Sequence, residues 1–316
     1  MLSEPAMSAS KHAGSSLSFR TEMEFAYGEP RGLGPGLVRL TANNPNPFTF
    51  KGTNTYIVGD TDLAIIDPGP EDDAHLASLL DVIAGRRVSH ILITHTHRDH
   101  IDGLAALQAE TGATVGGFGR AELNTPDVIL SPDGRNFIDS DFDPELKLRD
   151  GDSVSGDGWE LLVHHTPGHA PDHLCFEWTA RRILFSGDHV MGWNTTVIAP
   201  PEGHMGDYLA SLEKLIDRPV DVFHAGHGGQ IREPIRVTKA YLVHRRMREQ
   251  AITESIRAGN DTIAKIVALI YTQIDSSLRA AAMLSVQAHV EHMITKGMVR
   301  ADAEALGPDV TLALTK

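Results

Sequence analysis

At 316 residues, with 41% apolar and 22% charged side chains, the chain has the composition of a soluble globular protein of one large domain or two unequal ones. No apolar run approaches the roughly 20 residues that span a bilayer, which argues against a membrane protein. The net charge of −14 divides into −17 on residues 1–230 and +3 on residues 231–316, which disfavours a polyanionic partner.

The N-terminal residues are rich in Ser, Ala and Gly and lack the apolar stretch of a signal peptide. We therefore expect residues 1–20 to form a loose tail and the protein to be cytoplasmic. The single cysteine, Cys175, rules out an intrachain disulfide and agrees with a reducing compartment. Its alternation with strand residues predicts a small core side chain.

Residues 21–232 alternate short apolar runs with turn signals, which predicts an α/β domain with many strands and a few helices. The strand-like runs are Tyr56–Val58, Leu63–Ile66, His90–Thr94, Glu160–His164, Leu174–Trp178 and Arg182–Phe185. Helical periodicity appears in Ala74–Ile83, Leu104–Glu110 and Tyr208–Ile216. Several runs end in glycine-rich loops that hold His and Asp, as scaffolds do when they present functional groups at strand ends.

Residues 233–316 have a different pattern, which predicts a second domain. Pro234 suits a first helical turn, and the charged helical stretch after it extends to about Ala258. Residues 259–261 interrupt it, and Asp261 is positioned to cap the next helix. Further predicted elements are the helices Thr262–Tyr271 and Ser277–Lys296 and short strands at 298–299 and 310–314. Three helices and a small β-ribbon are the outline of a winged helix.

The sequence THTHRDH at residues 94–100 places four potential metal ligands within six residues. His95 and His97 are two residues apart, so at the end of a strand their side chains project to the same side. Asp99 and His100 follow as the chain turns into the next helix. A lone histidine is usually a core or surface residue, but this density between a strand and a helix predicts a metal site.

This HxHxDH motif resembles the signature of the metallo-β-lactamase superfamily. The other motifs of that family occur in order along the chain. Asp67 ends an Ile-Ile-Asp strand before Pro-Gly, and TPGH, SGD and AGH end at His169, Asp188 and His227. The resemblance covers roughly residues 21–230 and implies an αββα sandwich.

The resemblance also implies a ligand set for two divalent metal ions. The first ion takes three histidines, which are His95, His97 and His169. The second takes Asp99, His100 and His227, and Asp188 bridges the two ions. Catalytic roles are implied for Asp99, at the second ion, and for Asp67, which orients a ligand histidine or its loop.

The residue types agree with this chemistry. Imidazole and carboxylate ligands without thiolate favour zinc and also suit Mn or Fe. Two such cations ~3.5–4 Å apart can hold a hydroxide and lower the pKa of water towards ~7.

Within the superfamily the chain resembles the lactamase-beta-2-like branch, in which a winged helix follows the hydrolase. The sequence NTYIV at 54–58, the pair Thr195 and Thr196, and the YLxSL pattern at 208–212 carry this likeness. The chain departs from the branch after His100, where Ile-Asp-Gly stands in place of a small residue and two glycines. This departure alters the packing at the start of the helix rather than a ligand.

The resemblance leaves the substrate open, because the branch contains endoribonucleases as well as thioester and ester hydrolases. We favour a small acyl thioester or ester, since a single-stranded RNA track needs a positive groove with aromatic platforms and this chain has only 6% aromatic residues. A thiolate leaves with little protonation, whereas phosphodiester cleavage needs a proton donor, for which His204, His224 and Tyr208 are candidates. RNA is the alternative substrate, and a DNA-binding or metal-sensing regulator is a third hypothesis. The sequence makes no prediction of the oligomeric state.

Overall fold

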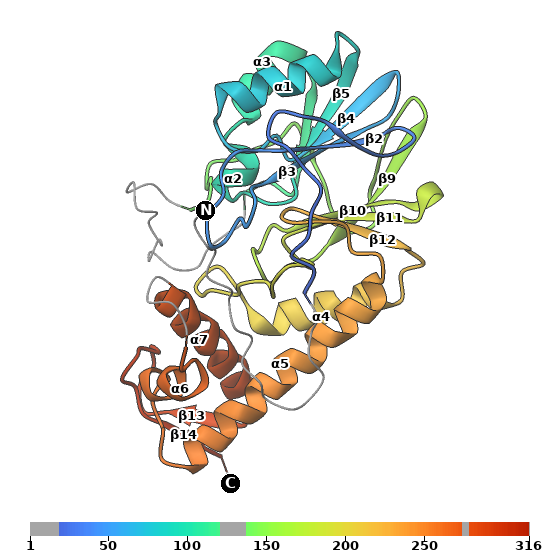
Figure 1. The fold of residues 1–316 in the computed structure, drawn as a ribbon. Coiled ribbons are helices and arrows are strands. Elements are labelled where there is room, and N and C mark those ends of the chain that lie inside the picture. The colour runs from blue at the N-terminus through green and yellow to red at the C-terminus, as the bar shows by residue number, and fades with distance from the viewer. Residues whose placement is uncertain (1–18, 121–136, 274–277, 316) are drawn as a thin grey trace.

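The computed structural model describes residues 19–120, 137–273 and 278–315. The predicted tail at residues 1–20 therefore lies outside the described residues except for its last two positions. Figure 1 shows two sheets, with helices on their outer sides, followed by a smaller helical unit at the C-terminal end.

The first sheet has seven strands in chain order, with antiparallel pairing from β1 to β4 and parallel pairing from β4 to β7. The strands are β1 (Arg31–Gly34), β2 (Leu37–Thr41), β3 (Asn54–Val58), β4 (Asp62–Ile66), β5 (Arg87–Leu92), β6 (Thr114–Gly117) and β7 (Leu146–Lys147).

The second sheet has five strands in the order β12-β11-β10-β9-β8, and only the β11–β12 pair is parallel. Its strands are β8 (Ser153–Gly156), β9 (Trp159–His165), β10 (Leu174–Trp178), β11 (Ile183–Gly187) and β12 (Val222–Ala225). A single 3-10 turn, η1 (Thr179–Arg181), connects β10 to β11.

Alternation of side chains along the strands places the two faces of the first sheet in different cores. Tyr56, Val58 and Ile66 point to one face and pack between the sheets with residues of the second sheet such as Phe176 and Phe185. The residues that alternate with them pack on the other face, beneath the helices α1 (Asp73–Ile83) and α3 (Leu104–Thr111). This period-two arrangement is what a sheet buried on both sides requires.

The outer face of the second sheet is covered by α4 (Met205–Ile216) and by the first half of α5 (Pro234–Arg257). Cys175 lies in this core, fully buried, as its place in a strand predicted. Helix, sheet, sheet and helix therefore stack as four layers, which confirms the predicted αββα sandwich.

The C-terminal unit has its own core between the end of α5, α6 (Ile263–Ile270), α7 (Arg279–Thr295) and the hairpin of β13 (Val299–Ala301) with β14 (Leu312–Leu314). These elements match the predicted three helices and two short strands to within a few residues, although the predicted start at Ser277 lies outside the described residues. The predicted cap was wrong by one position. Thr262 caps α6 by accepting a hydrogen bond from the Lys265 amide, and Asp261 instead pairs with the Lys265 ammonium group at 2.8 Å.

The strands absent from the sequence prediction are β1, β2, β6, β7, β8 and β12. Most are short or contain Gly and Ser, so their strand character comes from pairing with neighbours rather than from local composition. The remaining helix, α2 (Arg98–Ile101), is a single turn that follows the THTH segment. Within the described parts of the chain, no helix is both long and apolar enough to cross a bilayer.

Candidate metal centre

The predicted site residues lie at one edge of the sandwich, where strands of both sheets end. Asp67 follows β4, and the segment 94–100 follows β5 in the same sheet. His169, Asp188 and His227 follow β9, β11 and β12 of the second sheet. The edges are joined by backbone hydrogen bonds, from Leu174 to the Thr94 carbonyl at 2.7 Å and from Asn54 to the Gly226 carbonyl at 2.8 Å. Residues far apart in sequence are thereby brought to one place.

The first group is formed by three histidines whose ring nitrogens converge. His97 Nδ1 lies 2.8 Å from His95 Nε2 and 3.0 Å from His169 Nε2. These three residues form one of the sets of donors in the described chain that are close enough to share a metal ion.

The second group contains Asp99, His100 and His227. Asp99 Oδ2 lies 3.4 Å from His100 Nε2 and 3.3 Å from His227 Nε2. Both histidines are buried, and this group also qualifies as a set of converging donors.

Asp188 lies between the two groups. Its Oδ2 is 3.7 Å from His169 Nε2 in the first group and 3.2 Å from His227 Nε2 in the second. Its Oδ1 is 3.6 Å from His100 Nε2. The structure therefore brings all seven predicted ligands into one cluster, with Asp188 at the position that a bridging ligand would need.

The chemistry of this cluster fits divalent cations. Nε2 of His100 and Oδ1 of Asp188 are buried and have no hydrogen-bond partner among the described residues. Buried polar atoms are rarely left in that state unless they have another ligand. Burial, reinforced by the neighbouring imidazoles, holds the pKa of His95 well below its usual value, so this ring is neutral and its lone pair is available to a metal.

The carboxylates and the remaining imidazoles affect one another's ionisation. Burial opposes the charge on Asp188, but the His227 and His100 rings outweigh it and hold the pKa of the carboxyl well below its usual value. Burial likewise lowers the pKa of His100, and the carboxylates of Asp99, Asp188 and Asp67 more than reverse that effect. The carboxylates thus favour protons on the neighbouring imidazoles, and divalent cations would take the place of those protons.

Asp67 contacts both the ligand loop and a ligand histidine. One of its carboxylate oxygens accepts from the Thr94 amide at 2.8 Å, and the other lies 2.7 Å from the Thr94 hydroxyl and 2.8 Å from His100 Nδ1. Its backbone has a φ of 53°, in the left-handed region that Asp tolerates better than most residues. The sharp turn directs the carboxylate back under the segment 94–100.

Four further contacts to the cluster involve groups that the sequence did not single out. The Thr53 hydroxyl donates to Asp99 Oδ2 at 2.8 Å, and His227 Nδ1 lies 3.3 Å from the Gly52 carbonyl. His169 Nδ1 lies 2.7 Å from the Val197 carbonyl, and His97 Nε2 lies 3.0 Å from Glu202 Oε1. No motif marks these residues, because each lies far from its partner in the chain.

Three further polar side chains lie near the cluster without joining the converging donors. His173 is fully buried and accepts from the Asp188 amide at 3.1 Å, so it supports the loop that bears Asp188. The Tyr208 hydroxyl is buried and donates to the His189 carbonyl at 2.9 Å. His224 is buried against the rings of Tyr56 and Phe185.

His204 is the third of the proton donors considered from sequence, and it lies at the start of α4. Its side chain caps the helix by accepting from the Asp207 amide, and it is half exposed. None of the three considered donors therefore has a ring or hydroxyl directed at the converging ligand atoms.

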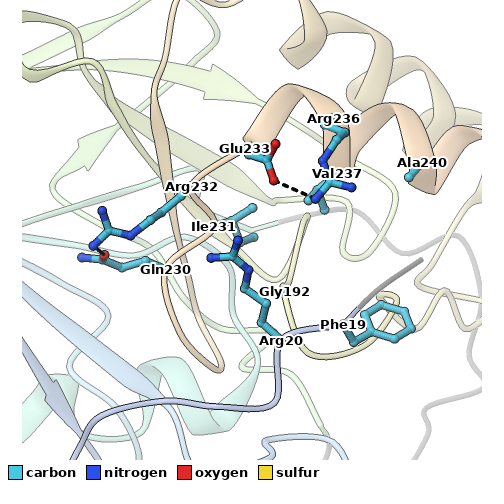
Figure 2. Close-up of a pocket in the computed structure, with 10 residues that line it drawn as sticks. All are labelled: Phe19, Arg20, Gly192, Gln230, Ile231, Arg232, Glu233, Arg236, Val237 and Ala240. Carbon is cyan, nitrogen blue, oxygen red and sulfur yellow. Dashed lines mark hydrogen bonds and ion pairs between the residues drawn. The ribbon is translucent and has the colours of Figure 1, made fainter. Parts of the chain in front are cut away.

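A separate pocket lies where residues 19 and 20, Gly192 and the start of α5 meet (Figure 2). Its volume of about 40 Å³ holds a few water molecules. Two of its arginines already have partners, since Arg232 donates to Gln230 and Arg236 pairs with Glu233. None of the cluster residues lines it, so we place the candidate site at the cluster.

Comparisons with known proteins agree with this geometry. The family model of the metallo-beta-lactamase superfamily matches residues 48–227, and that of the beta-lactamase associated winged helix domain matches residues 262–306. The chain is 32% identical over 288 residues to the beta-lactamase-like protein 2 homolog of Drosophila melanogaster, covering 86% of this chain and 92% of that protein.

Two further relatives extend the comparison. An atrochrysone carboxyl ACP thioesterase of Paecilomyces divaricatus is 28% identical over 291 residues, covering 84% of this chain and 85% of that protein. A crystal structure of a metallo-beta-lactamase family protein from Thermus thermophilus superposes with a TM-score of 0.70 at 25% identity, covering 90% of this chain and all of that one.

Proposed function

Because the chain belongs to the metallo-β-lactamase superfamily, we propose that it is a hydrolase that uses two divalent metal ions to cleave a small acyl thioester or ester. The observation that carries this proposal is the cluster of seven converging His and Asp side chains at the edge of the sandwich. The comparisons support hydrolysis as the reaction class, and one relative is named as a thioesterase.

In this proposal His95, His97 and His169 would hold the first ion. Asp99, His100 and His227 would hold the second, and Asp188 would serve both. Nitrogen and oxygen donors without thiolate favour zinc, while Mn or Fe would also suit them. Bound ions of this kind lower the pKa of water towards ~7 and polarise a carbonyl oxygen.

The remaining chemistry falls to the chain's own side chains. Asp67 accepts a hydrogen bond from His100 Nδ1, which leaves Nε2 free to act as a ligand, and it fixes the loop through Thr94. The Thr53 hydroxyl donates to Asp99 and so keeps one carboxylate oxygen in place. These contacts hold the ligand atoms in position before any substrate arrives, which is how a hydrolase avoids reorganisation during the reaction.

Of the two proposed substrate classes, the thioester suits the site better, because its leaving group needs little help from an acid. None of His204, His224 and Tyr208 directs a polar atom at the cluster, so the chain does not offer those groups to an alkoxide leaving group. A thiolate is stable enough to leave without protonation.

The charges around α5 also support a small substrate over RNA. The basic run at residues 244–248 is not a continuous positive surface, because Arg245 is buried and bonds the Thr196 carbonyl. Arg248 lies over the Tyr271 ring, and Arg246 is 3.8 Å from Glu213. We propose that residues 21–232 form the hydrolase domain and that residues 233–316 close the sandwich on its outer side rather than bind nucleic acid.

The deciding experiment compares substrates and ligand variants. The protein loaded with Zn²⁺ should hydrolyse acyl-CoA thioesters, and His97→Ala should abolish that activity. Asp188→Ala should lose metal from both positions, whereas His227→Ala should lose mainly one ion per chain. Efficient cleavage of a labelled single-stranded RNA with negligible thioesterase activity would contradict the substrate class, and retention of two ions in Asp188→Ala would contradict the bridging role.

A further inference from the structure

Each ligand histidine has a second ring nitrogen that faces away from the other ligands. In the first group these nitrogens of His97 and His169 contact the loop at residues 188–204, and in the second group they contact other parts of the chain. We propose that Glu202 is the positioning residue of His97, and that the loop at residues 188–204 makes the first metal position depend on helix α5. This inference rests on the proposed two-metal function and adds to it a means by which the first half of α5 acts on one of the two positions.

The geometry of His97 carries the first step. Its Nδ1 is the atom that faces His95 and His169, and its Nε2 faces Glu202 Oε1 at 3.0 Å. A neutral imidazole carries one proton, on one nitrogen only. A proton held on Nε2 by the charge of the neighbouring carboxylate leaves the lone pair on Nδ1, directed at the other two histidines. Carboxylates that orient ligand histidines in this way strengthen metal binding.

Glu202 is largely buried and is not a surface carboxylate. Its side chain is 15% exposed, and His97 is the ion-pair partner that the described residues provide for it. A buried carboxylate is costly unless it is paired, so the position must be maintained by the surrounding chain. The backbone around it is fixed on both sides, by the hydrogen bond from Gly203 to the Ala199 carbonyl at 2.8 Å and by that from His204 to the Gly168 carbonyl at 2.9 Å.

The same loop supplies a second outer contact to the first position. The Val197 carbonyl lies 2.7 Å from His169 Nδ1, so two of the three histidines contact residues of the segment 197–202. The loop is also tied to Asp188, because the Thr196 hydroxyl donates to the Asp188 carbonyl at 2.8 Å.

Helix α5 in turn holds this loop from the outside. The Tyr241 hydroxyl is fully buried, donates to the Met191 carbonyl at 2.5 Å and accepts from the Met191 amide at 3.2 Å. Arg245, one turn further along α5, is also buried and donates to the Thr196 carbonyl. Its guanidinium lies over the Tyr208 ring at 5.1 Å, which leaves it little freedom to adopt another position. A shift of α5 would therefore be transmitted to the loop whose Val197 carbonyl contacts His169 and whose Glu202 side chain contacts His97.

The second position has a different set of supports. His100 Nδ1 contacts the carboxylate of Asp67, which follows β4. Asp99 accepts a hydrogen bond from the hydroxyl of Thr53, which directly precedes β3. His227 Nδ1 faces the Gly52 carbonyl in the loop before β3. All three contacts come from residues next to strands of the first sheet. The loop at residues 188–204 contacts these ligands through Asp188, the residue that the two positions share.

The experiment measures metal binding in metal-free protein titrated with Zn²⁺ by calorimetry, for wild type and four variants. Glu202→Ala removes the carboxylate, and Glu202→Gln keeps a side chain of the same size but removes its charge. Arg245→Met removes the donor to the loop at similar volume. Thr53→Val is the matched control for the second position, because it removes a hydroxyl without changing side-chain size. Anomalous scattering from crystals grown with limiting Zn²⁺ identifies the ion that each variant loses.

We expect Glu202→Ala to weaken the first ion by 10- to 100-fold and to leave the second within about threefold. Glu202→Gln should weaken the same ion less, and Arg245→Met should weaken that ion more than the other. Thr53→Val should give the opposite pattern. Loss confined to the first ion would also change the absorption spectrum of the Co²⁺ form, which a general loss of stability would not.

The outcomes separate this inference from the function on which it rests. If wild type binds fewer than two ions, the proposed two-metal function fails. If wild type binds two ions and both Glu202 variants bind both with unchanged affinity, or lose both equally, the role of Glu202 is overturned. If Arg245→Met leaves the first ion unaffected while Glu202→Ala weakens it, the dependence on α5 is overturned. Should Glu202→Ala not fold, Glu202→Gln decides the question alone.

Discussion

Gly226 offers a direct test of the cluster, because a single methyl group there would enter it. A Cβ at this position would lie 2.5 Å from Asp188 Oδ1 and 2.6 Å from His100 Cε1. The φ of Gly226 is outside the left-handed region, so the backbone can accept alanine. Gly226→Ala therefore tests the space beside the ligands and not the conformational freedom of glycine.

The expected loss of rate follows from the overlap between the added methyl group and the two ligand side chains. Ordinary contacts of a Cβ begin near 3.4 Å, so the carboxylate and the ring must each move by about 1 Å. A displacement of that size in catalytic geometry costs about 10²-fold in rate. Overpacking of a well-ordered site costs about 1–3 kcal/mol of stability, which a domain of this size survives.

The assay measures kcat/KM for an acyl thioester, bound metal per chain and thermal unfolding, with Gly32→Ala as the matched control. Gly32 lies in β1, and a Cβ there would have no atom within 4 Å. We expect Gly226→Ala to stay folded, to lose about 10²-fold in kcat/KM and to bind metal more weakly, while Gly32→Ala behaves like wild type. Wild-type kcat/KM with full metal content in Gly226→Ala would refute the assignment of Asp188 and His100 as ligands.

Three further predictions concern stability. Asp72 caps α1 by accepting from two backbone amides, so Asp72→Ala should lower the free energy of unfolding in urea by about 1 kcal/mol, and an unchanged value would contradict the cap. Burial raises the pKa of Glu177, but hydrogen bonds from His164 and Arg218 outweigh burial and hold the pKa below its usual value. The ionised carboxylate therefore stabilises the fold above pH ~4.5, and this stabilisation is lost as pH falls through the folded pKa. Glu177→Gln should therefore cost about 2 kcal/mol at pH 7 and progressively less towards pH 3, and a cost independent of pH would count against the ion pair. Removal of metal by a chelator should lower the melting temperature, since an ion present at 100 times its dissociation constant stabilises the fold by about 2.7 kcal/mol, and an unchanged melting temperature would contradict tight binding.

The sequence predicted those parts of the fold and of the site that a pattern of neighbouring residues can indicate. The THTHRDH segment names four residues of the cluster because they lie side by side in the chain, and the buried strands β3, β4 and β10 are recognisable from their apolar runs. Asp67 was predicted to orient a ligand histidine or the loop, and the structure places its carboxylate at both.

Other features depend on tertiary structure and left no local signal. Thr53 meets Asp99 across 46 residues, and Glu202 meets His97 only because the loop at residues 188–204 folds back over the first sheet's edge. Short strands such as β6 and β8 contain Gly and Ser and exist because their neighbours pair with them. Arg245 gave no local signal either, because it lies in a charged helical stretch and yet is buried against Tyr208.

The central claim is that the cluster of His and Asp residues binds two divalent ions and that hydrolysis depends on both. The most direct measurement adds Zn²⁺ stepwise to metal-free protein while the hydrolysis of an acyl-CoA thioester is followed, with metal content determined in parallel. The account predicts that activity appears with the added metal and reaches its maximum at two ions per chain. Full activity in the metal-free protein, or a maximum reached at one ion with no second ion bound, would contradict it.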